Sequence, residues 1–232
     1  MNKTQHRSIA RAFLPDRFHY FYALSKLHSD PAYAAVSALL AETTAPILDV
    51  GCGIGLLAQY LRAAGTRASY TGVDNDSRKI DSAARAARIN TLQHSRFLVH
   101  DLRRSVPDHQ GNVVILDVLH YLAPDIQNAL LEQAAVCLSP GAQLIIRCGL
   151  DDGGWRSKIT HAVDALGHSI RWMNTAPTRY PRREQLAKQL AKLGLRAEFR
   201  PLWGRTPFNN WLIVAAHDAA LDTAVVNAIR EA

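Results

Sequence analysis

The strongest constraint on the fold is a strand, a glycine-rich turn and a helix in direct succession. Residues 47–50 are mostly apolar and predict a strand, Gly51, Gly53 and Gly55 alternate after it, and residues 56–64 carry apolar side chains at helical spacing. Glycines tolerate positive φ angles and let the backbone approach a ligand. The helix that follows directs its free N–H groups at the turn. The stretch therefore predicts the first βα unit of a nucleotide-binding α/β domain.

The glycine spacing separates two classes of cofactor. A dinucleotide fingerprint needs Gly-x-Gly-x-x-Gly, and Leu56 occupies the place of its third glycine. The pattern present is Asp-x-Gly-x-Gly-x-Gly, from Asp49 to Gly55. It resembles the first motif of class I S-adenosylmethionine (SAM) dependent methyltransferases. The resemblance implies that Asp49 lies near the methionine amino end of SAM and that the turn, which includes Cys52, passes under the methionine and ribose.

Acidic residues also follow the next predicted strands. Residues 68–73 predict a second strand that ends at Asp74 and Asn75. An acid at this distance from the glycine turn accepts the two ribose hydroxyls of a bound nucleoside. Residues 96–100 predict a third strand, followed by Asp101 and Leu102. The resemblance implies that the acid there hydrogen-bonds the adenine amino group.

The resemblance covers residues 45–216 and implies the whole architecture. This is an α/β fold with a Rossmann-like, doubly wound sheet of seven strands, six parallel and strand seven antiparallel, and with helices on both faces. The remaining strands are expected at 113–116, 143–147, 196–202 and 210–216, and a last helix at 182–193. We expect residues 1–44 to form an N-terminal helical cap, and residues 45–232 to form the methyltransferase domain, with an acceptor-binding insertion at about 151–182.

Within the cap, residues 1–15 are expected to lack regular structure, and helices are expected from Asp16 and from Pro31. Residues 18–22 are five consecutive ring-bearing side chains, which a helix cannot bury against one core face. In the resembled family such helices cover the SAM site and one side of the acceptor pocket. We therefore expect Tyr20 or Tyr22 to line that pocket and Lys26 to point toward it. The alternative is that the aromatic residues pack on neighbouring helices and that Lys26 is solvated.

The expected catalytic residues follow strand four. Asp117 and His120 are three residues apart and share one face if a helical turn begins there. His120 is a candidate general base, since an unperturbed histidine has a pKa of about 6.5. Tyr121 is a candidate for orienting the acceptor, and Asp117 for contacting the cofactor. The alternative is catalysis by alignment alone, because the leaving group of a sulfonium is already activated. No second acid stands at a spacing that completes a metal site.

The acceptor is expected to contact the segment after strand five. Trp155, Arg156, Trp172, Arg179 and Tyr180 lie in it, and such a pocket suits an aromatic or otherwise apolar acceptor. Residues 151–205 contain 11 Lys and Arg but five Asp and Glu. The excess indicates an anionic partner, such as a small acid, an acyl group on an acidic carrier protein, or RNA. A solvated basic face is the alternative.

The overall composition adds expectations about location and partners. The first 16 residues have no apolar core typical of a secretory signal, and no stretch reaches membrane-spanning length. Three cysteines without metal spacing fit a reduced, cytoplasmic protein. We expect a monomer or homodimer that does not contact a membrane, and nucleic acid is the disfavoured partner because the chain has no appended RNA-binding module and no basic tail.

The function predicted from the resemblance is SAM-dependent methylation of a small molecule, with S-adenosylhomocysteine as the second product. The acceptor is expected to be a hydroxylated aromatic or acyl compound, free or carrier-bound, methylated on oxygen. The alternatives are an RNA or protein methyltransferase and a SAM-binding module without catalysis. A nicotinamide-dependent oxidoreductase is disfavoured by Leu56 in the glycine turn.

Overall fold

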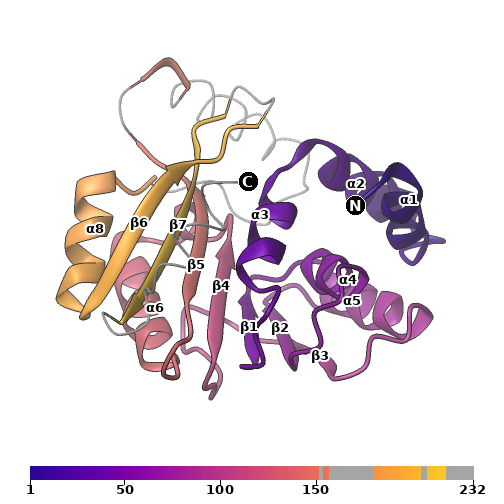
Figure 1. Ribbon diagram of the computed structural model, residues 1–232, viewed down its shortest axis with the longest axis horizontal. Coiled ribbons are helices and arrows are strands. Elements are labelled where there is room, and N and C mark those ends of the chain that lie inside the picture. Colours follow the sequence, from indigo (N-terminus) through magenta and orange to yellow (C-terminus); the bar gives the residue numbers. More distant parts are fainter. Residues whose placement is uncertain (152–153, 157–179, 205–207, 218–232) are drawn as a thin grey trace.

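The computed structural model describes residues 1–232 except 152–153, 157–179, 205–207 and 218–232. Seven strands form one mixed sheet in the order β3-β2-β1-β4-β5-β7-β6 (Figure 1). The strands are β1 (Ile47–Val50), β2 (Tyr70–Asp74), β3 (Ser95–Val99), β4 (Asn112–Leu116), β5 (Leu144–Gly149), β6 (Leu195–Pro201) and β7 (Asn210–His217). Strand β7 is antiparallel to both of its neighbours, and the other pairs are parallel. The predicted sheet, including its antiparallel seventh strand, is confirmed.

Helices cover both faces of the sheet (Figure 1). The helices that follow the strands are α4 (Leu56–Ala63), α5 (Ser77–Ile89), α6 (Pro124–Val136) and α8 (Arg183–Lys192), and a 3-10 turn, η1, spans Leu119–Tyr121. The N-terminal helices are α1 (Lys3–Arg11), α2 (Arg17–Ser29) and α3 (Ala32–Leu39). Within the described ranges, no helix is both long and apolar enough to cross a membrane.

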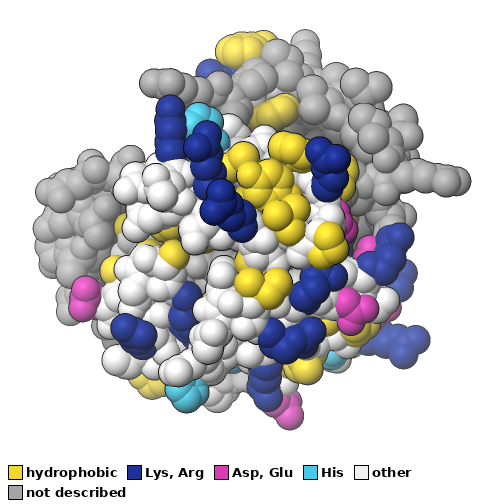
Figure 2. Space-filling model, turned by 90° about the vertical axis from the view of Figure 1, so that its right-hand side faces the viewer, with side chains coloured by type: hydrophobic (Ala, Val, Ile, Leu, Met, Phe, Trp, Pro, Cys, Tyr) yellow, Lys and Arg dark blue, Asp and Glu magenta, His cyan; other side chains and the backbone are white. Residues whose placement is uncertain are grey.

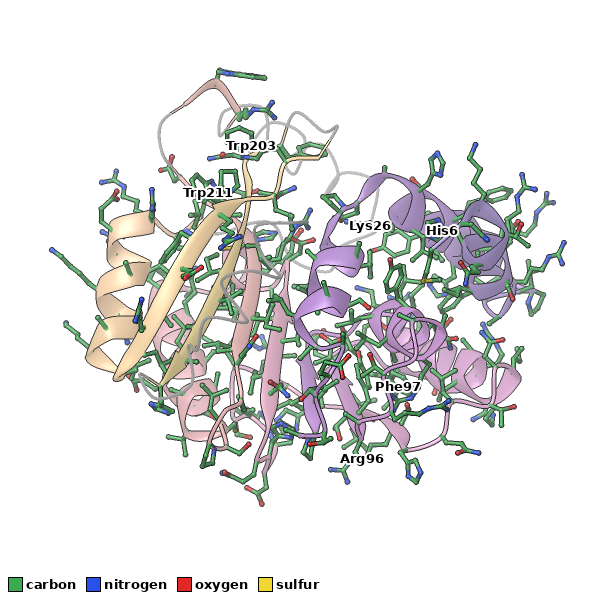
Figure 3. The ribbon with its side chains drawn as sticks, in the orientation of Figure 1. His6, Lys26, Arg96, Phe97, Trp203 and Trp211 are labelled. Carbon is green, nitrogen blue, oxygen red and sulfur yellow. The ribbon has the colours of Figure 1, made fainter. Side chains whose placement is uncertain are left out.

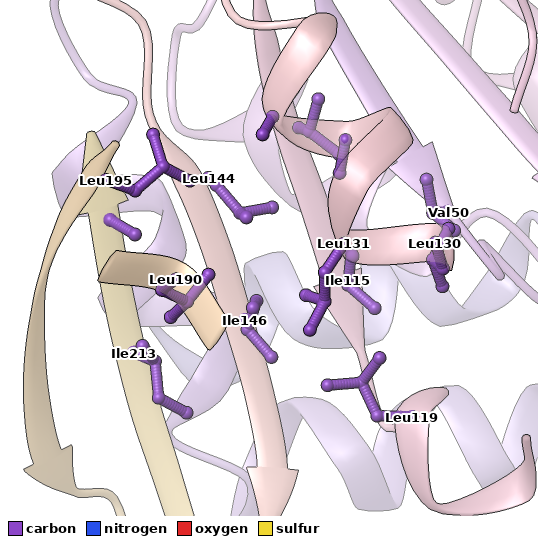
Figure 4. Close-up of a cluster of buried hydrophobic side chains, with 14 of the residues drawn as sticks. Val50, Ile115, Leu119, Leu130, Leu131, Leu144, Ile146, Leu190, Leu195 and Ile213 are labelled. Carbon is purple, nitrogen blue, oxygen red and sulfur yellow. The ribbon is translucent and has the colours of Figure 1, made fainter. Parts of the chain in front are cut away.

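Two apolar layers hold the helices against the sheet. Ile115 and Ile146 of the central strands join Leu131 of α6 and Leu190 of α8 in one cluster (Figure 4). Residues that point to the opposite face, such as Val114, form a second cluster with α3 and α4. The central strands are therefore buried on both faces, as is usual for parallel sheets.

The first residues of the chain form a helix, so the expectation of an irregular segment at 1–15 was wrong. Asn2 and Gln5 make a capping box at its start: the backbone N–H of Gln5 donates to Asn2 Oδ1 at 3.0 Å, and that of Asn2 donates to Gln5 Oε1 at 2.8 Å. Ile9 and Ala10 are buried in a cluster that also contains residues of α2. The mostly polar composition of this segment obscured both the cap and the short buried face.

Helix α2 begins where the sequence predicts it, with Asp16 as the N-cap that accepts the backbone N–H of His19 at 2.9 Å. Its aromatic side chains divide between several environments, as expected for a ring-bearing run. Phe18 and Phe21 are 55% and 56% exposed. Figure 2 views the side where the N-terminal helices lie and shows hydrophobic side chains gathered among Lys and Arg. Tyr22 and Lys26 instead face a cavity.

Candidate active site

A cavity of about 530 Å³ lies where the strands β1, β2, β4 and β5 end, beneath the N-terminal helices. It sits at the point where the strand order reverses between β1 and β4, which is where open α/β sheets bind ligands. Its volume is in the range of small-molecule and cofactor sites. Its walls come from the loops after the strands, from α2 and α3, and from the start of β7: Tyr22, Lys26, Tyr33, Asp49, Gly51, Cys52, Gly53, Ile54, Leu56, Leu57, Asp74, Asn75, Lys79, Asp101, Leu102, Arg103, Leu116, Asp117, Val118, His120, Tyr121, Leu122, Arg147, Gly149, Tyr180, Phe208 and Asn210.

The glycine turn is shaped for close approach. Gly51, Gly53 and Gly55 have φ angles of 77°, 54° and 73°, a region that side chains with a Cβ rarely occupy. A Cβ at Gly53 would meet no protein atom within 4 Å, so this glycine presents bare backbone to the cavity. A Cβ at Gly51 would lie 2.3 Å from Cγ2 of Val118 in the loop after β4. The turn therefore needs glycine both for its backbone angles and for its packing.

We expect Gly51→Ala to lower the free energy of unfolding by about 2 kcal/mol more than Gly141→Ala, because overpacking adds to the backbone strain. Gly141 is a matched control, since its φ is 79° and a Cβ there meets nothing within 4 Å. Urea unfolding of both variants measures the difference. Adding Val118→Ala to Gly51→Ala should recover most of this difference. Equal losses of stability in Gly51→Ala and Gly141→Ala would contradict the packing argument.

Asp74, at the end of β2, is held in one orientation by the backbone. Its Oδ2 accepts the N–H of Gly53 at 3.0 Å, and its Oδ1 accepts the N–H of Asp76 at 2.9 Å. The side chain is buried, and Asn75 lines the cavity beside it. Each carboxylate oxygen keeps capacity to accept a further hydrogen bond. The arrangement suits a pair of vicinal hydroxyls.

Asp49, at the centre of β1, is also buried and lines the cavity. The phenol of Tyr70 donates a hydrogen bond to its Oδ2. Burial raises the pKa of Asp49 to about 7; the hydrogen bond from Tyr70 acts in the opposite sense, and the charge of Asp74 adds to the increase. The carboxyl group therefore changes charge near neutral pH.

Asp101 and Leu102 follow β3 and line the same end of the cavity. Arg103 grips the carboxylate of Asp101, with its Nη2 at 2.7 Å from Oδ2. These hydrogen bonds lower the pKa of Asp101 to about 2. The carboxylate is therefore charged at neutral pH and is an acceptor for a polar edge of a ligand.

A network of four charges connects the N-terminal helices to the sheet. Arg147 of β5 is buried, and its Nη2 lies 3.3 Å from Oδ2 of Asp30, which follows α2, while its Nη1 donates to Asp117. Lys26 of α2 lies 2.9 Å from Asp30 and 3.8 Å from Asp117. In Figure 3, Lys26 is on the sheet-facing side of the N-terminal helices. Burial acts to raise the pKa of Asp30, but the charges of Arg147 and Lys26 outweigh it and lower that pKa.

His120 lies in η1 and is buried against aromatic rings. Its ring is stacked on Tyr180, with centroids 5.1 Å apart and an interplanar angle of 7°, and contacts Tyr121 at 4.1 Å. Burial lowers the pKa of His120 to about 4, so the ring is neutral at pH 7. Asp117 precedes it with a φ of 58°, an uncommon angle for a residue other than glycine. Both residues line the cavity, as the spacing predicts.

Some residues predicted for the acceptor pocket lie elsewhere. Tyr20 packs on the core of the N-terminal helices rather than lining the cavity. Trp155 is 62% exposed, and the Arg156 guanidinium lies 4.7 Å from its ring centroid and 4.6 Å from that of Trp203. These cation-π contacts hold Arg156 outside the cavity lining. Trp172 and Arg179 lie outside the described residues.

The cavity also contains residues that the sequence analysis did not select: Tyr33, Lys79, Arg147, Phe208 and Asn210. Arg147 carries a visible signal, because it is a charged residue inside an otherwise apolar strand. Phe208 and Asn210 precede or begin the antiparallel strand, and only the folded sheet brings them to β5. The thiol of Cys52 has its pKa raised by burial, which agrees with a packing role. Among the described residues, no group of three or more His, Cys, Asp or Glu could hold a metal ion.

Comparison with known families matches one part of the chain. Residues 47–141, from β1 to the turn before β5, match the family model described as a methyltransferase domain. This match covers less than half of the chain and relates that part to methyltransferase domains. The loops after β1, β2 and β4, which line much of the cavity, lie within the matched residues.

Solved structures share the fold of this chain. The chain is similar to an O-methyltransferase family protein from Burkholderia thailandensis, with a TM-score of 0.65 and 20% identity, over 88% of this chain and 61% of that one. It is also similar to magnesium protoporphyrin IX methyltransferase from Synechocystis with bound S-adenosylhomocysteine, with a TM-score of 0.63 and 16% identity, over 91% of this chain and 94% of that one.

One curated relative matches part of the chain. An uncharacterised RNA methyltransferase from Gloeobacter violaceus is 32% identical over 71 residues, which is 31% of this chain and 15% of that protein. The present chain thus spans a small part of the length of this relative.

Proposed function

We propose that the protein transfers the methyl group of SAM to an oxygen of a small aromatic acceptor. The observation that carries the proposal is one cavity lined both by carboxylates and by aromatic rings. Asp49, Asp74 and Asp101 line the part formed by β1 to β3. Aromatic side chains from α2, α3, η1 and the segments before α8 and β7 line the same cavity: Tyr22, Tyr33, His120, Tyr121, Tyr180 and Phe208.

The carboxylates fit SAM residue by residue. Asp74 has accepting capacity for a ribose diol, and the bare backbone of Gly53 leaves room beside it. Asp49 offers a carboxylate to an ammonium group, and Asp101 offers one to a polar base edge. When bound, SAM would supply a methyl group on a sulfonium, whose leaving group is already activated for transfer to an acceptor oxygen.

The aromatic rings support an aromatic acceptor, because flat rings stack on tyrosine and histidine side chains. Lys26 and Arg147 place two cations in the same cavity, although Asp30 and Asp117 neutralise them. A hydroxylated aromatic compound, with or without a carboxylate, fits this combination of rings and balanced charges. The outer Arg156 and Trp155 are outside the cavity, so we do not assign them to the acceptor.

A direct test uses SAM, the purified protein and a panel of phenols and hydroxylated aromatic acids, with formation of S-adenosylhomocysteine as the readout. We expect turnover with aromatic hydroxyl compounds and none with aliphatic alcohols of similar polarity. Binding of S-adenosylhomocysteine without turnover on any acceptor would favour a SAM-binding module. Turnover on RNA alone would favour the activity named for the relative from Gloeobacter violaceus.

We propose that His120 mainly positions the acceptor and is a weak base for the acceptor's hydroxyl proton. A histidine with a pKa of about 4 is neutral at pH 7 but is a poor base. We expect His120→Phe, which retains a ring against Tyr180, to lower kcat by about tenfold and to leave the affinity for S-adenosylhomocysteine unchanged. Steady-state kinetics and calorimetry separate the two effects. A loss of affinity for the nucleoside would place His120 at the cofactor instead of the acceptor.

A further inference from the structure

Tyr70 lies on the strand next to Asp49 and donates a hydrogen bond to its carboxyl group, but Tyr70 does not line the cavity. It is 1% exposed on β2, and its hydroxyl donates to Oδ2 of Asp49 on β1. On the other side of Asp49, β4 contributes the uncharged Val114. The hydrogen bond thus comes from the interior of the fold, whereas the carboxyl group also faces the ligand site.

Few other titratable groups surround Asp49. Asp74 ends the same strand as Tyr70, Cys52 lies in the glycine turn, and Tyr33 reaches over from α3. Burial raises the pKa values of the Cys52 thiol and of both phenols, so these groups stay neutral between pH 5.5 and 8. Asp49, with a pKa of about 7, changes its charge within that range.

We infer that Tyr70 is a positioning residue, which fixes the Asp49 carboxyl group toward the cavity and favours its charged form when the ammonium group of a ligand enters. The inference rests on the proposed function, because SAM and S-adenosylhomocysteine carry such an ammonium group. A cation beside Asp49 favours the carboxylate, so binding releases a proton and affinity falls as the pH drops below about 7.

The test is calorimetric titration with S-adenosylhomocysteine between pH 5.5 and 8, for the wild type and for Tyr70→Phe. Loss of a hydrogen bond to a charged group raises the pKa of Asp49 by about one further unit. The affinity of the variant should therefore be about tenfold below that of the wild type at pH 6.5 and only about twofold below it at pH 8. Titration of the ligand's own amino group is common to both proteins and cancels in the comparison.

Two further variants separate positioning from general destabilisation. Tyr60→Phe removes a buried phenol hydroxyl outside the cavity lining and should leave the pH profile unchanged. Asp49→Asn should bind weakly with little dependence on pH in this range. If Tyr70→Phe follows the wild-type profile, with or without a uniform loss of affinity, the inference is wrong although SAM binding stands. If the wild type binds no S-adenosylhomocysteine at any pH, the proposed function itself is overturned, and this inference with it.

Discussion

Replacement of Arg147 by methionine is expected to lower the free energy of unfolding by about 3–5 kcal/mol, as is typical when one partner of a buried charge pair is removed. The side chains of Arg147 and Asp30 are 7% and 8% exposed, so the variant leaves a buried carboxylate with Lys26 as its remaining cationic partner among the described residues. Methionine retains the apolar stem and removes the charge. Urea unfolding at pH 7 gives the value.

The pH dependence of the stability lost in Arg147→Met shows whether the ion pair with Asp30 causes it. The pKa of Asp30 is lowered in the folded protein, so its stabilising contribution is present above the unfolded pKa of about 3.9 and disappears as the pH falls through the folded value. The difference between the wild type and Arg147→Met should therefore narrow below about pH 4. Arg200→Met is the control, since Arg200 pairs with Glu198 but is 26% exposed, and its loss should cost below about 1 kcal/mol. Similar losses in the two variants would argue against a buried network.

Asp74→Ala is expected to weaken the binding of S-adenosylhomocysteine by about 100-fold. The carboxylate is positioned by two backbone N–H groups, and its free accepting capacity faces the cavity. Two hydrogen bonds from ribose hydroxyls to a charged acceptor contribute about 1.5–3 kcal/mol each, and water recovers part of that in the variant. Calorimetry measures the change.

Two controls accompany this variant. Asp81→Ala removes an exposed acid from α5, near the same strand end, and should leave the affinity unchanged. Asp74→Asn keeps hydrogen-bonding capacity without the charge and should fall between the wild type and Asp74→Ala. Full affinity in Asp74→Ala would show that Asp74 does not bind the ribose hydroxyls.

The parts of the site that the sequence predicts share one property: each of their residues belongs to a short, contiguous sequence pattern. Asp49 and Gly55 belong to one continuous strand and turn. Asp74 ends the next strand, at the distance from the glycine turn that is expected of a ribose-binding acid. Parallel strands then bring these ends to one edge of the sheet. The cofactor side of the cavity therefore follows from contiguous patterns.

The charge network could not be predicted in the same way. Asp30 and Arg147 are 117 positions apart, and their contact depends on how the N-terminal helices settle on the sheet. Arg156 was expected in the pocket because of its charge, yet stacking between two indole rings holds it outside. Even the first helix depended on a capping box between Asn2 and Gln5 within a polar segment. Side-chain orientation, more than element order, limits what the sequence reveals here.

The cavity combines strand-end loops with a separate wall from α2 and α3, and this division affects how such proteins diversify. Tyr22 and Tyr33 lie on the N-terminal helices, apart in sequence from Asp74 and the glycine turn. Under the proposed function, replacement of the N-terminal helices is a route to new acceptor preferences. The constraint on such an exchange is Arg147, since a transplanted segment must bring an acid to the place of Asp30 or leave a cation buried without compensation. We therefore expect chimeras that lack an acid at the place of Asp30 to be less stable than those that retain one.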